Sequence, residues 1–445
     1  MSNDSASVTQ FIDARSVALI GLGKIGLPLA MQIAENGWKV YGCDINEEVV
    51  AIVNSGRPPF SGEPGMDKLH ALVTQGNLVA TTHTAEAISK SDVVIIVVPL
   101  IVDQLGNPEF KNIDSVTRIT GASLKPETLV IYETTLPVGT TRNRFGSLLE
   151  KESGLRVGTD FFLAYSPERV YSGRVFENLS QYPKLVGGVD EKSSEKVVTF
   201  YSSILNFNVR TDLPRPNGVW DLGSSEAAEL AKLAETTYRD VNIGLANEFA
   251  LAAEKIGVDV YKVIEACNSQ PFSHIHQPGI SVGGHCIPVY PHFYLQGDPA
   301  ATVVEAARKV NLRMPVHAVD HLSEQLGDLT GKTVAILGLA YRPGVKEHAF
   351  SGAFALADLL TKRGATPKVH DPLYSQNELE SHGLVPFKLG EACDAVVIQT
   401  NHREYESLSS TDFPNAKVVY DGRNSTTLQL RQQLTTHVLG KGSEN

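Results

Sequence analysis

The chain has 445 residues, enough for two or three domains, and its hydrophobic content of 42% and charged content of 20% are ordinary for a soluble globular protein. The net charge of -11 argues against a general nucleic-acid binder, but not against an anionic small ligand held at a locally basic site. The cysteines are widely spaced without a CxxC pair, so we expect neither a disulfide framework nor a metal site. Since no signal-peptide pattern and no membrane-length apolar run is found, we expect a cytoplasmic protein that does not act in the membrane.

The first part of the chain alternates short apolar runs with helical patterns. Residues 93–98 are apolar without a break, which is typical of a strand buried on both faces of a parallel sheet. Strands are predicted at residues 16–21, 39–44, 92–98, 128–133 and 161–165. The alternation predicts an α/β domain through about residue 210, followed by the turn-rich segment 214–218.

The middle of the chain has a helical pattern. Residues 224–256 carry apolar side chains at helical spacing, with a serine as candidate N-cap and Gly257 as candidate stop. A second helical pattern covers residues 301–327, and we expect an interruption near Pro315.

A second α/β unit follows the helical region. Its predicted strands lie at residues 333–338, 368–370, 394–399 and 417–420. We therefore predict two Rossmann-like doubly wound domains joined by a helical middle domain with a long central helix. The predicted boundaries are residues 1–212, 213–325 and 326–445.

A glycine-rich turn opens the first α/β domain. The motif GLGKIG places Gly21, Gly23 and Gly26 directly after the first predicted strand and before a helical stretch. The second predicted strand ends at Asp44, at the spacing expected for an acid that binds the ribose hydroxyls of a dinucleotide. A tight turn that uses glycine only for geometry would not explain this acid. Asp44 would repel a 2′-phosphate and no arginine follows it closely, so NAD is favoured over NADP.

A cysteine lies in a second glycine-rich segment, GGHCIPVYP, at residues 283–291. Gly283 and Gly284 allow the backbone to approach a ligand closely, and the proline after the cysteine restricts the exit path. Cys286 is thus placed on a rigid loop where its thiol can react with a bound molecule. The alternative is a buried structural cysteine, which is a common environment for this residue.

Several motifs occur together along the chain. They are GLGKIGLPLA (21–30), ETTLPVGTT (133–141), YSPERV (165–170), ELAKLAETTYRDVNIGLANE (229–248), GGHCIPVYP (283–291) and LGLAYRPGV (337–345). In this order the chain resembles the UDP-glucose/GDP-mannose dehydrogenase family, from about residue 15 to residue 430.

The resemblance implies two successive NAD-dependent oxidations that convert the C6 alcohol of a nucleotide sugar into a carboxylate. Cys286 would capture the intermediate aldehyde as a thiohemiacetal and then carry a thioester that water hydrolyses. Lys232 would supply positive charge to the oxyanion, and Glu168 would handle the hydrolytic water. Thr135 would lie near the nicotinamide and the reactive carbon. Without the resemblance, Lys232 would be interpreted as a solvated helix lysine and Glu168 as a surface carboxylate. Thr135 would be interpreted as a hydroxyl at the end of a strand.

The resemblance also implies the remaining site residues. Cofactor contacts are expected from Gly21, Gly23, Lys24, Ile25, Gly26, Asp44, Pro99 and Thr135. Substrate contacts are expected from Glu168, Arg169, Val170, Lys232, Gly283, Gly284 and Arg342. The long central helix resembles the family's dimer spine, so we expect a homodimer.

The chain departs from the family pattern at several positions. Thr236 replaces a common asparagine, and Tyr290 replaces a common aspartate four residues after Cys286, which leaves open how the thiol is activated. The remaining departures are Lys24 in the glycine loop, Phe272 where an arginine is common, and Ala349 and Phe350 in place of an Arg-Glu pair.

His285, directly before the cysteine, resembles the branch of the family that acts on UDP-N-acetylhexosamines. A UDP-glucose 6-dehydrogenase is the alternative substrate assignment. A single-step hydroxyacid dehydrogenase would share the first domain but would need no cysteine. A non-catalytic nucleotide-sugar binder is the fourth hypothesis, based on the substitutions at Thr236 and Tyr290.

Overall fold

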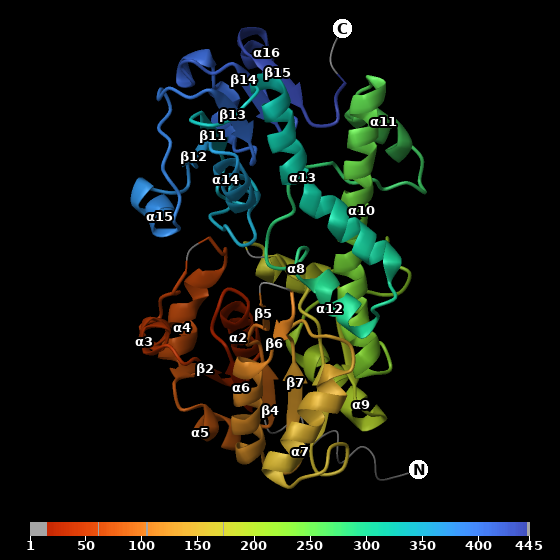
Figure 1. Ribbon diagram of the computed structural model, residues 1–445. Helices are drawn as coiled ribbons and strands as arrows, with labels where there is room; N and C mark the ends of the chain where they lie inside the picture. Colours follow the sequence, from red (N-terminus) through yellow and green to blue (C-terminus); the bar gives the residue numbers. More distant parts are fainter. Residues whose placement is uncertain (1–15, 61, 104–105, 172, 443–445) are drawn as a thin grey trace. The chain divides into compact units, whose positions relative to one another are not determined.

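The computed structural model describes residues 16–60, 62–103, 106–171 and 173–442 (Figure 1). It contains two compact units, residues 1–234 and residues 235–445, and each has its own predominantly parallel sheet.

The first unit is built on an eight-stranded sheet. Its strand order is β10 (Val219–Asp221), β9 (Lys184–Gly188), β8 (Phe162–Tyr165), β7 (Leu129–Tyr132), β4 (Val93–Ile96), β1 (Ser16–Ile20), β2 (Lys39–Cys43) and β3 (Leu78–Thr81). All neighbouring strands are parallel except β8 and β9, which are antiparallel. The strand order reverses between β1 and β4, so this is the point where an open α/β sheet binds its ligand.

Because both faces of the sheet are buried, its strands are continuous apolar runs, and such runs could be predicted from the sequence. Every residue of β4 is fully buried, and each such side chain stabilises the fold by about 1.5–3 kcal/mol. The five predicted strands are confirmed, whereas β3, β9 and β10 were not predicted. A lysine opens β9, and it interrupts the apolar pattern on which the prediction depended.

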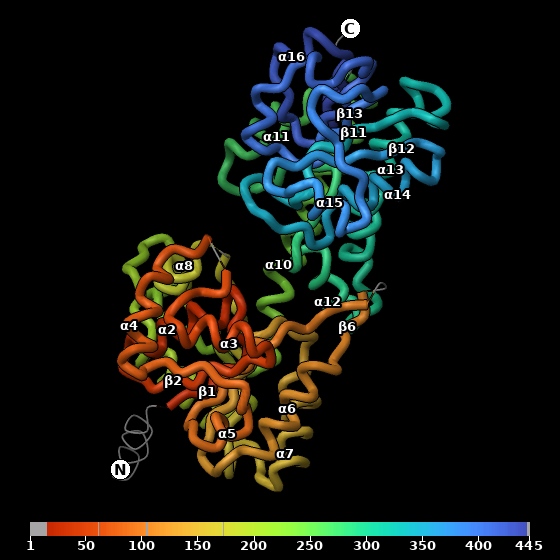
Figure 2. The backbone as a smooth tube through the Cα atoms, turned by 90° about the vertical axis from the view of Figure 1, so that its left-hand side faces the viewer, coloured from red at the N-terminus to blue at the C-terminus, as the bar shows by residue number. Residues whose placement is uncertain are grey.

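Helices cover both faces of this sheet, as Figure 2 shows. One layer contains α2 (Gly26–Glu35), α4 (Leu69–Thr74), α8 (Val175–Gln181) and α9 (Glu191–Ile204), which share one apolar core. The other contains α5 (Thr84–Ser89), α6 (Lys111–Ser123) and α7 (Ser147–Ser153). A further helix, α3 (Glu47–Asn54), follows β2, and a π-helical turn, Thr140–Gly146, precedes α7.

The predicted long helix is confirmed as α10 (Ser225–Ile256). The hydroxyl oxygen of Ser224 accepts the N–H of Ala227 at 3.1 Å, which satisfies one of the unpaired donors at the helix start. Gly257 follows the last turn with φ of +75°, a left-handed conformation that favours glycine and ends the helix.

The predicted interruption at Pro315 is wrong. Helix α13 runs from Thr302 to Leu326 with Pro315 inside it. A proline in a helix removes one backbone hydrogen bond and crowds the preceding turn. Here Met314, Ala318 and Val319 are fully buried around it, and the burial of this face offsets the lost bond.

The second unit is built on a five-stranded parallel sheet. Its order is β12 (Thr366–His370), β11 (Thr333–Leu337), β13 (Ala395–Ile398), β14 (Val418–Asp421) and β15 (Thr435–Val438). One face shares a core with α10, α11 (Val260–Asn268), α13, α14 (Gly352–Lys362) and α15 (Gln376–Ser381). The shorter helices α12 (Tyr290–Gly297) and α16 (Leu428–Gln433) complete the unit. Two Rossmann-like sheets and a long central helix confirm the predicted fold class.

A buried acid ties the long helices to this second sheet. Glu254 of α10 accepts hydrogen bonds from His317 of α13 at 2.8 Å and from the N–H of Gly440 at 2.8 Å, and it lies 3.4 Å from the ring nitrogen of His437. Although burial raises its pKa, these hydrogen bonds outweigh burial and lower the pKa of Glu254 to about 2.

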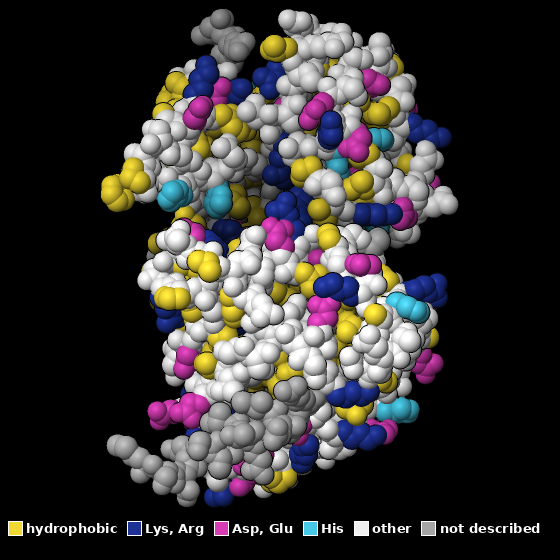
Figure 3. Space-filling model, turned by 180° about the vertical axis from the view of Figure 1, so that it is seen from behind, with side chains coloured by type: hydrophobic (Ala, Val, Ile, Leu, Met, Phe, Trp, Pro, Cys, Tyr) yellow, Lys and Arg dark blue, Asp and Glu magenta, His cyan; other side chains and the backbone are white. Residues whose placement is uncertain are grey.

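The surface of the first unit carries both signs of charge. On the face in Figure 3, lysine and arginine side chains alternate with aspartate and glutamate in the lower half of the view. Among the described residues, the structure has no helix with the length and apolar character that a membrane span requires.

Candidate active site

The glycine loop lies at the switch point between β1 and β4. Gly21 has φ of +106°, and its N–H donates to the carbonyl of Cys43 at 2.8 Å, which joins the loop to the end of β2. A Cβ atom on Gly26 would lie 1.8 Å from the carbonyl oxygen of Gly21, so only glycine fits between the loop and α2. A Cβ on Gly23 would meet nothing within 4 Å, so the outer side of the loop is open. This shape suits a pyrophosphate lying against the loop and the start of α2.

Asp44 joins the loop to the second strand. Its carboxylate accepts the N–H of Leu22 at 3.0 Å and the N–H of Asn46 at 2.9 Å. A carboxylate has about four acceptor sites, so two remain for ribose hydroxyls. The next helix begins with Glu47 and Glu48 in its first turn, and these further negative charges also disfavour a 2′-phosphate. The residues of this loop therefore fit NAD.

Two loops at the carboxyl ends of β4 and β7 lie beside each other. The hydroxyl of Thr134 donates to the carbonyl of Val98 at 2.6 Å, which holds the loops together. Next to these residues, Pro99 is exposed and Thr135 is 6% exposed. The predicted cofactor residues of the first unit therefore lie at the carboxyl ends of β1, β2, β4 and β7.

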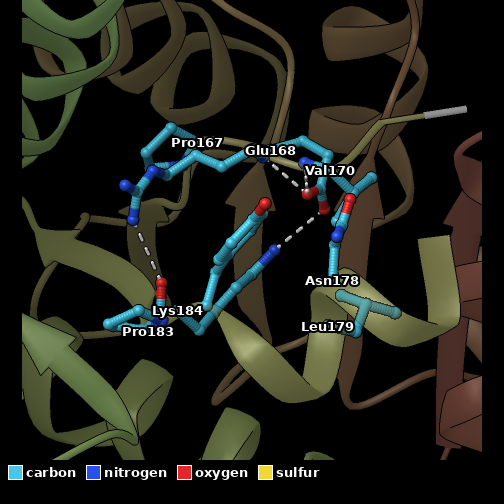
Figure 4. Close-up of a pocket in the computed structure, with 9 residues that line it drawn as sticks. Pro167, Glu168, Val170, Asn178, Leu179, Pro183 and Lys184 are labelled. Atoms are coloured by element: carbon cyan, nitrogen blue, oxygen red, sulfur yellow. Dashed lines mark hydrogen bonds and ion pairs between the residues drawn. The ribbon is translucent and has the colours of Figure 1, made fainter. Parts of the chain in front are cut away.

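Glu168 follows β8 and is held firmly. Its Oε1 atom accepts the N–H groups of Arg169 at 2.6 Å and Val170 at 2.9 Å, and Lys184 donates to its Oε2 at 3.2 Å (Figure 4). The same residues line a small hollow with Asn178 of α8. Burial raises the pKa of Glu168, but the charge of Lys184 and the hydrogen bonds outweigh burial and hold it below its ordinary value.

Lys232 of α10 lies beside this acid. Its side chain is 7% exposed, and its Nζ donates to the backbone carbonyl of Glu168 at 2.6 Å. The predicted substrate residues Glu168, Arg169, Val170 and Lys232 are thus brought together in the first unit. Lys232 is therefore not the solvated helix lysine of the alternative interpretation.

Glu133 and Lys184 are buried residues that the sequence analysis did not assign. Glu133 directly follows β7 and is 1% exposed, and its Oε2 accepts a hydrogen bond from Lys184 at 3.1 Å. Tyr201 of α9 donates its hydroxyl to the other oxygen of Glu133. Burial raises the pKa of Glu133 to about 7, against the lowering effect of Lys184. Glu133 follows the apolar run of β7, and Lys184 precedes the apolar run of β9. A charged side chain at the edge of an apolar run was the sequence signal that could have identified these two buried residues.

Glu229 is a second acid that the sequence analysis left without a role. It is fully buried at the start of α10 and accepts the N–H of Gly139 at 2.5 Å, the N–H of Thr141 at 2.8 Å and the hydroxyl of Thr141 at 2.6 Å. These bonds anchor α10 to the loop that follows Thr135. Burial raises the pKa of Glu229 to about 7.

The cysteine loop lies in the second unit and packs on the segment after β11. A Cβ on Gly283 would lie 2.5 Å from the Cβ of Tyr341, and Gly284, with φ of +93°, donates its N–H to the carbonyl of Ala349 at 2.7 Å. The two glycines therefore let the loop pack closely on Tyr341, whereas the sequence analysis expected them to allow a close approach to a ligand. Cys286 is partly exposed, so it is not the buried structural cysteine of the alternative interpretation.

The backbone around Cys286 begins a helix. Its carbonyl accepts the N–H of Val289 at 3.2 Å and the N–H of Tyr290 at 2.9 Å, immediately before α12. Tyr290, which replaces the family aspartate, is the first residue of that helix. These bonds fix the backbone of Cys286 at the entry to α12.

Two further side chains of the second unit flank this loop. His285 is exposed, and its ring nitrogen lies 3.5 Å from a carboxylate oxygen of Glu347. Arg342 is partly buried, and its Nε has no hydrogen-bond partner among the described residues. An unsatisfied buried donor next to the glycine-rich loop is suited to an anionic ligand.

The positions that depart from the family pattern differ in environment. Thr236 is fully buried in α10, whereas Phe272 is 92% exposed, so only the first is part of a packed interior. Phe350 has φ of +51°, a left-handed conformation that is uncommon for a residue other than glycine.

Comparison with known proteins agrees with the geometry of both units. Residues 15–205 match the NAD binding domain of the UDP-glucose/GDP-mannose dehydrogenase family, residues 226–313 match its central domain, and residues 335–427 match its UDP binding domain. The chain belongs to this family. The predicted family, enzyme class and cofactor are confirmed: the protein is an NAD-dependent nucleotide-sugar dehydrogenase, and its substrate is a UDP-sugar.

Individual relatives cover nearly the whole chain. UDP-N-acetyl-D-mannosamine dehydrogenase of Pyrococcus horikoshii is 36% identical over 421 residues, which is 92% of this chain and 95% of the relative. The solved structure of the UDP-D-ManNAc dehydrogenase from Pyrococcus horikoshii superposes with a TM-score of 0.84 at 33% identity, covering 96% of this chain and 100% of that one. A UDP-glucose dehydrogenase from Pyrobaculum islandicum gives a TM-score of 0.83 at 27% identity, covering 96% and 98%.

Proposed function

We propose that this protein oxidises the C6 hydroxyl of a UDP-N-acetylhexosamine to the uronic acid, with two NAD reduced per sugar. The observation that carries the proposal is the joint presence of a partly exposed Cys286 on a glycine-rich loop and a buried Lys232–Glu168 pair. A single-step hydroxyacid dehydrogenase would need no such cysteine. A non-catalytic binder would not need to keep a lysine 7% exposed against the backbone of an ionised acid.

The proposed reaction has four steps. NAD, when bound, supplies the hydride acceptor for both oxidations. The first oxidation gives the aldehyde, to which the Cys286 thiolate adds to form a thiohemiacetal. The second oxidation gives a thioester. Water then attacks the acyl carbon, its proton passes to Glu168, the C–S bond breaks, and Cys286 leaves as a thiolate.

Each proposed catalytic residue has a part in these steps. Lys232 stabilises the oxyanion of the tetrahedral species, since a buried ammonium acts strongly where water is excluded. Thr135 borders the nicotinamide position at the end of β7, and Arg342 binds the diphosphate of the substrate through its unsatisfied Nε. Gly283 and Gly284 let the cysteine loop pack closely on Tyr341, which fixes the position of Cys286. We retain the boundaries 1–212, 213–325 and 326–445 as the proposed division into NAD-binding, helical and UDP-sugar-binding domains.

The covalent step is tested with Cys286→Ser. A serine alkoxide is far harder to form than a thiolate, so the variant should bind UDP-sugar but stop before the acid. Wild-type production of uronic acid by Cys286→Ser would remove Cys286 as the nucleophile. Cys267, which is also a partly buried free cysteine, provides the control variant Cys267→Ser, which should retain full activity.

The sugar is proposed on two grounds, the His285 motif and the name of the Pyrococcus relative. A panel of UDP-N-acetylmannosamine, UDP-N-acetylglucosamine, UDP-N-acetylgalactosamine and UDP-glucose, followed by NADH absorbance, decides it. The proposal predicts that kcat/KM for an N-acetylated sugar exceeds that for UDP-glucose at least tenfold. A preference for UDP-glucose would favour the second candidate, which the likeness to the Pyrobaculum enzyme supports.

We also propose a homodimer in the cytoplasm. Tyr238, Leu245, Phe249 and Ile256 are spaced to lie on one face of α10, and their side chains are 55%, 44%, 39% and 73% exposed. A second copy would cover this apolar stripe. Light scattering of Phe249→Asp should give a monomer mass, and an unchanged dimer would exclude this face as the interface.

A further inference from the structure

A buried ionic cluster extends inward from Glu168. Lys184 bridges the two acids, with its Nζ 3.2 Å from Glu168 Oε2 and 3.1 Å from Glu133 Oε2. Glu133 is 1% exposed and Lys184 is 5% exposed, whereas the side chain of Glu168 retains 13% exposure at the edge of the hollow in Figure 4. The cluster is therefore buried from solvent at Glu133 and accessible to solvent at Glu168.

The charges of this cluster do not balance when every group is ionised. Two carboxylates and one ammonium carry a net charge of about -1, and burial of an uncompensated charge is unfavourable. One proton shared by the two acids makes the cluster neutral. Two backbone N–H groups stabilise Glu168 as a carboxylate, which favours Glu133 as the site of a bound proton. The raised pKa of Glu133, about 7, agrees with this distribution.

Other groups also contact this cluster. Tyr201 of α9 donates to Glu133, and its ring lies 4.8 Å from the Nζ of Lys184. Lys232 of α10 donates to the backbone carbonyl of Glu168, and the guanidinium of Arg169 donates to the carbonyl of Pro183 at 3.3 Å. The two cations face backbone oxygens in these contacts, whereas Lys184 contacts both carboxylates.

We propose that Glu133 is a positioning residue that tunes Glu168 through Lys184, so that loss of the proton from Glu133 makes Glu168 a stronger base. This inference rests on the proposed role of Glu168 in thioester hydrolysis. When Glu168 accepts the proton of the attacking water while Glu133 is protonated, the buried cluster becomes cationic. When Glu133 is ionised, the same proton transfer produces a neutral cluster. The second case is more favourable in a buried site.

The test measures hydrolysis against pH in Glu133→Gln and Lys184→Met. A UDP-sugar 6-aldehyde with NAD starts the reaction at the second oxidation, and release of uronic acid is followed by quenched flow and mass spectrometry. Glu133→Gln removes a negative charge, so the acid limb of the profile should move to lower pH with a lower plateau. Lys184→Met removes a positive charge, so the limb should move to higher pH. A charge within about 4–6 Å moves such a limb by about one to three pH units.

Controls separate this inference from a structural effect and from failure of the proposed function. Lys125→Met breaks a Lys–Asp pair of 2.8 Å elsewhere in the first unit and should leave the profile unchanged. Lys184→Arg keeps the charge and should restore the wild-type profile if Lys184→Met does not fold. Equal rate losses at every pH in the two cluster variants, or limbs that move in the same direction, would overturn the proposal. Glu168→Gln with wild-type hydrolysis would instead overturn the proposed base.

Discussion

Two glycines in the same loop should respond differently to the same small change. A Cβ on Gly26 would lie 1.8 Å from the carbonyl oxygen of Gly21, so Gly26→Ala forces the backbone of the loop or of α2 to shift. A Cβ on Gly23 meets nothing within 4 Å of the protein, so Gly23→Ala leaves the fold intact. If the pyrophosphate of NAD lies over the open side of the loop, however, the added methyl group of Gly23→Ala occupies its place.

The expected magnitudes follow from these distances. Overpacking costs about 1–3 kcal/mol, and an approach of 1.8 Å to a backbone oxygen places Gly26→Ala in the upper part of this range, at about 2–3 kcal/mol. Alanine gains about 1 kcal/mol over glycine in a helix, so the net destabilisation should be about 1–2 kcal/mol. For a domain of this size, that corresponds to a fall in Tm of about 2–8 °C. NAD at 100 times its Kd should stabilise the wild type by about 2.7 kcal/mol, and Gly23→Ala should lose most of this gain.

Thermal unfolding with and without NAD, together with calorimetric titration, measures both effects. Gly23→Ala should unfold at the wild-type temperature without cofactor and bind NAD at least tenfold more weakly. Wild-type NAD affinity in Gly23→Ala would show that the cofactor does not approach this part of the loop. An unchanged Tm in Gly26→Ala would show that the loop accommodates the added methyl group without loss of stability. That result would contradict the conclusion that only glycine fits at this position.

Three further substitutions test other parts of the structure. Asp44→Ala should lower kcat/KM for NAD at least tenfold and raise the NADP/NAD ratio of kcat/KM; an unchanged ratio would exclude Asp44 as the discriminating group. The pKa of Glu254 falls from an ordinary 4.5 to about 2 on folding, so its contribution of about 3 kcal/mol is complete above pH 4.5 and disappears as the pH falls through about 2. Urea unfolding should show this dependence in the exposed control Glu248→Gln but not in Glu254→Gln. Glu229→Gln places an amide N–H against the N–H of Gly139, so its Tm should correspond to a loss of about 1–3 kcal/mol; a wild-type Tm would mean that the helix anchor is not essential.

Local patterns made much of the fold predictable. The apolar run of β4, the glycine turn after β1 and the 32-residue helix α10 were each visible because one short segment carries the whole signal. The error at Pro315 has the opposite origin. A proline weakens a helix locally, but the packing that keeps α13 continuous comes from residues distant in sequence.

The site was predictable to a similar extent. Cys286 and Lys232 stood out through their motifs, but the partners of Glu168 did not. Lys184 is 16 residues from Glu168 and 51 from Glu133, and only the pairing of β9 with β8 brings it between the two acids. The hydrophobic pattern shows each of these charges only as a break in an apolar run, and it does not show which of the charges are neighbours in the fold.

The ratio of NADH formed to sugar consumed tests the central claim most directly. With a limiting amount of the N-acetylated UDP-sugar, the account predicts two NADH per sugar and a uronic acid as the product identified by mass spectrometry. One NADH per sugar with an aldehyde or ketone product would contradict the two-step oxidation and the covalent role of Cys286.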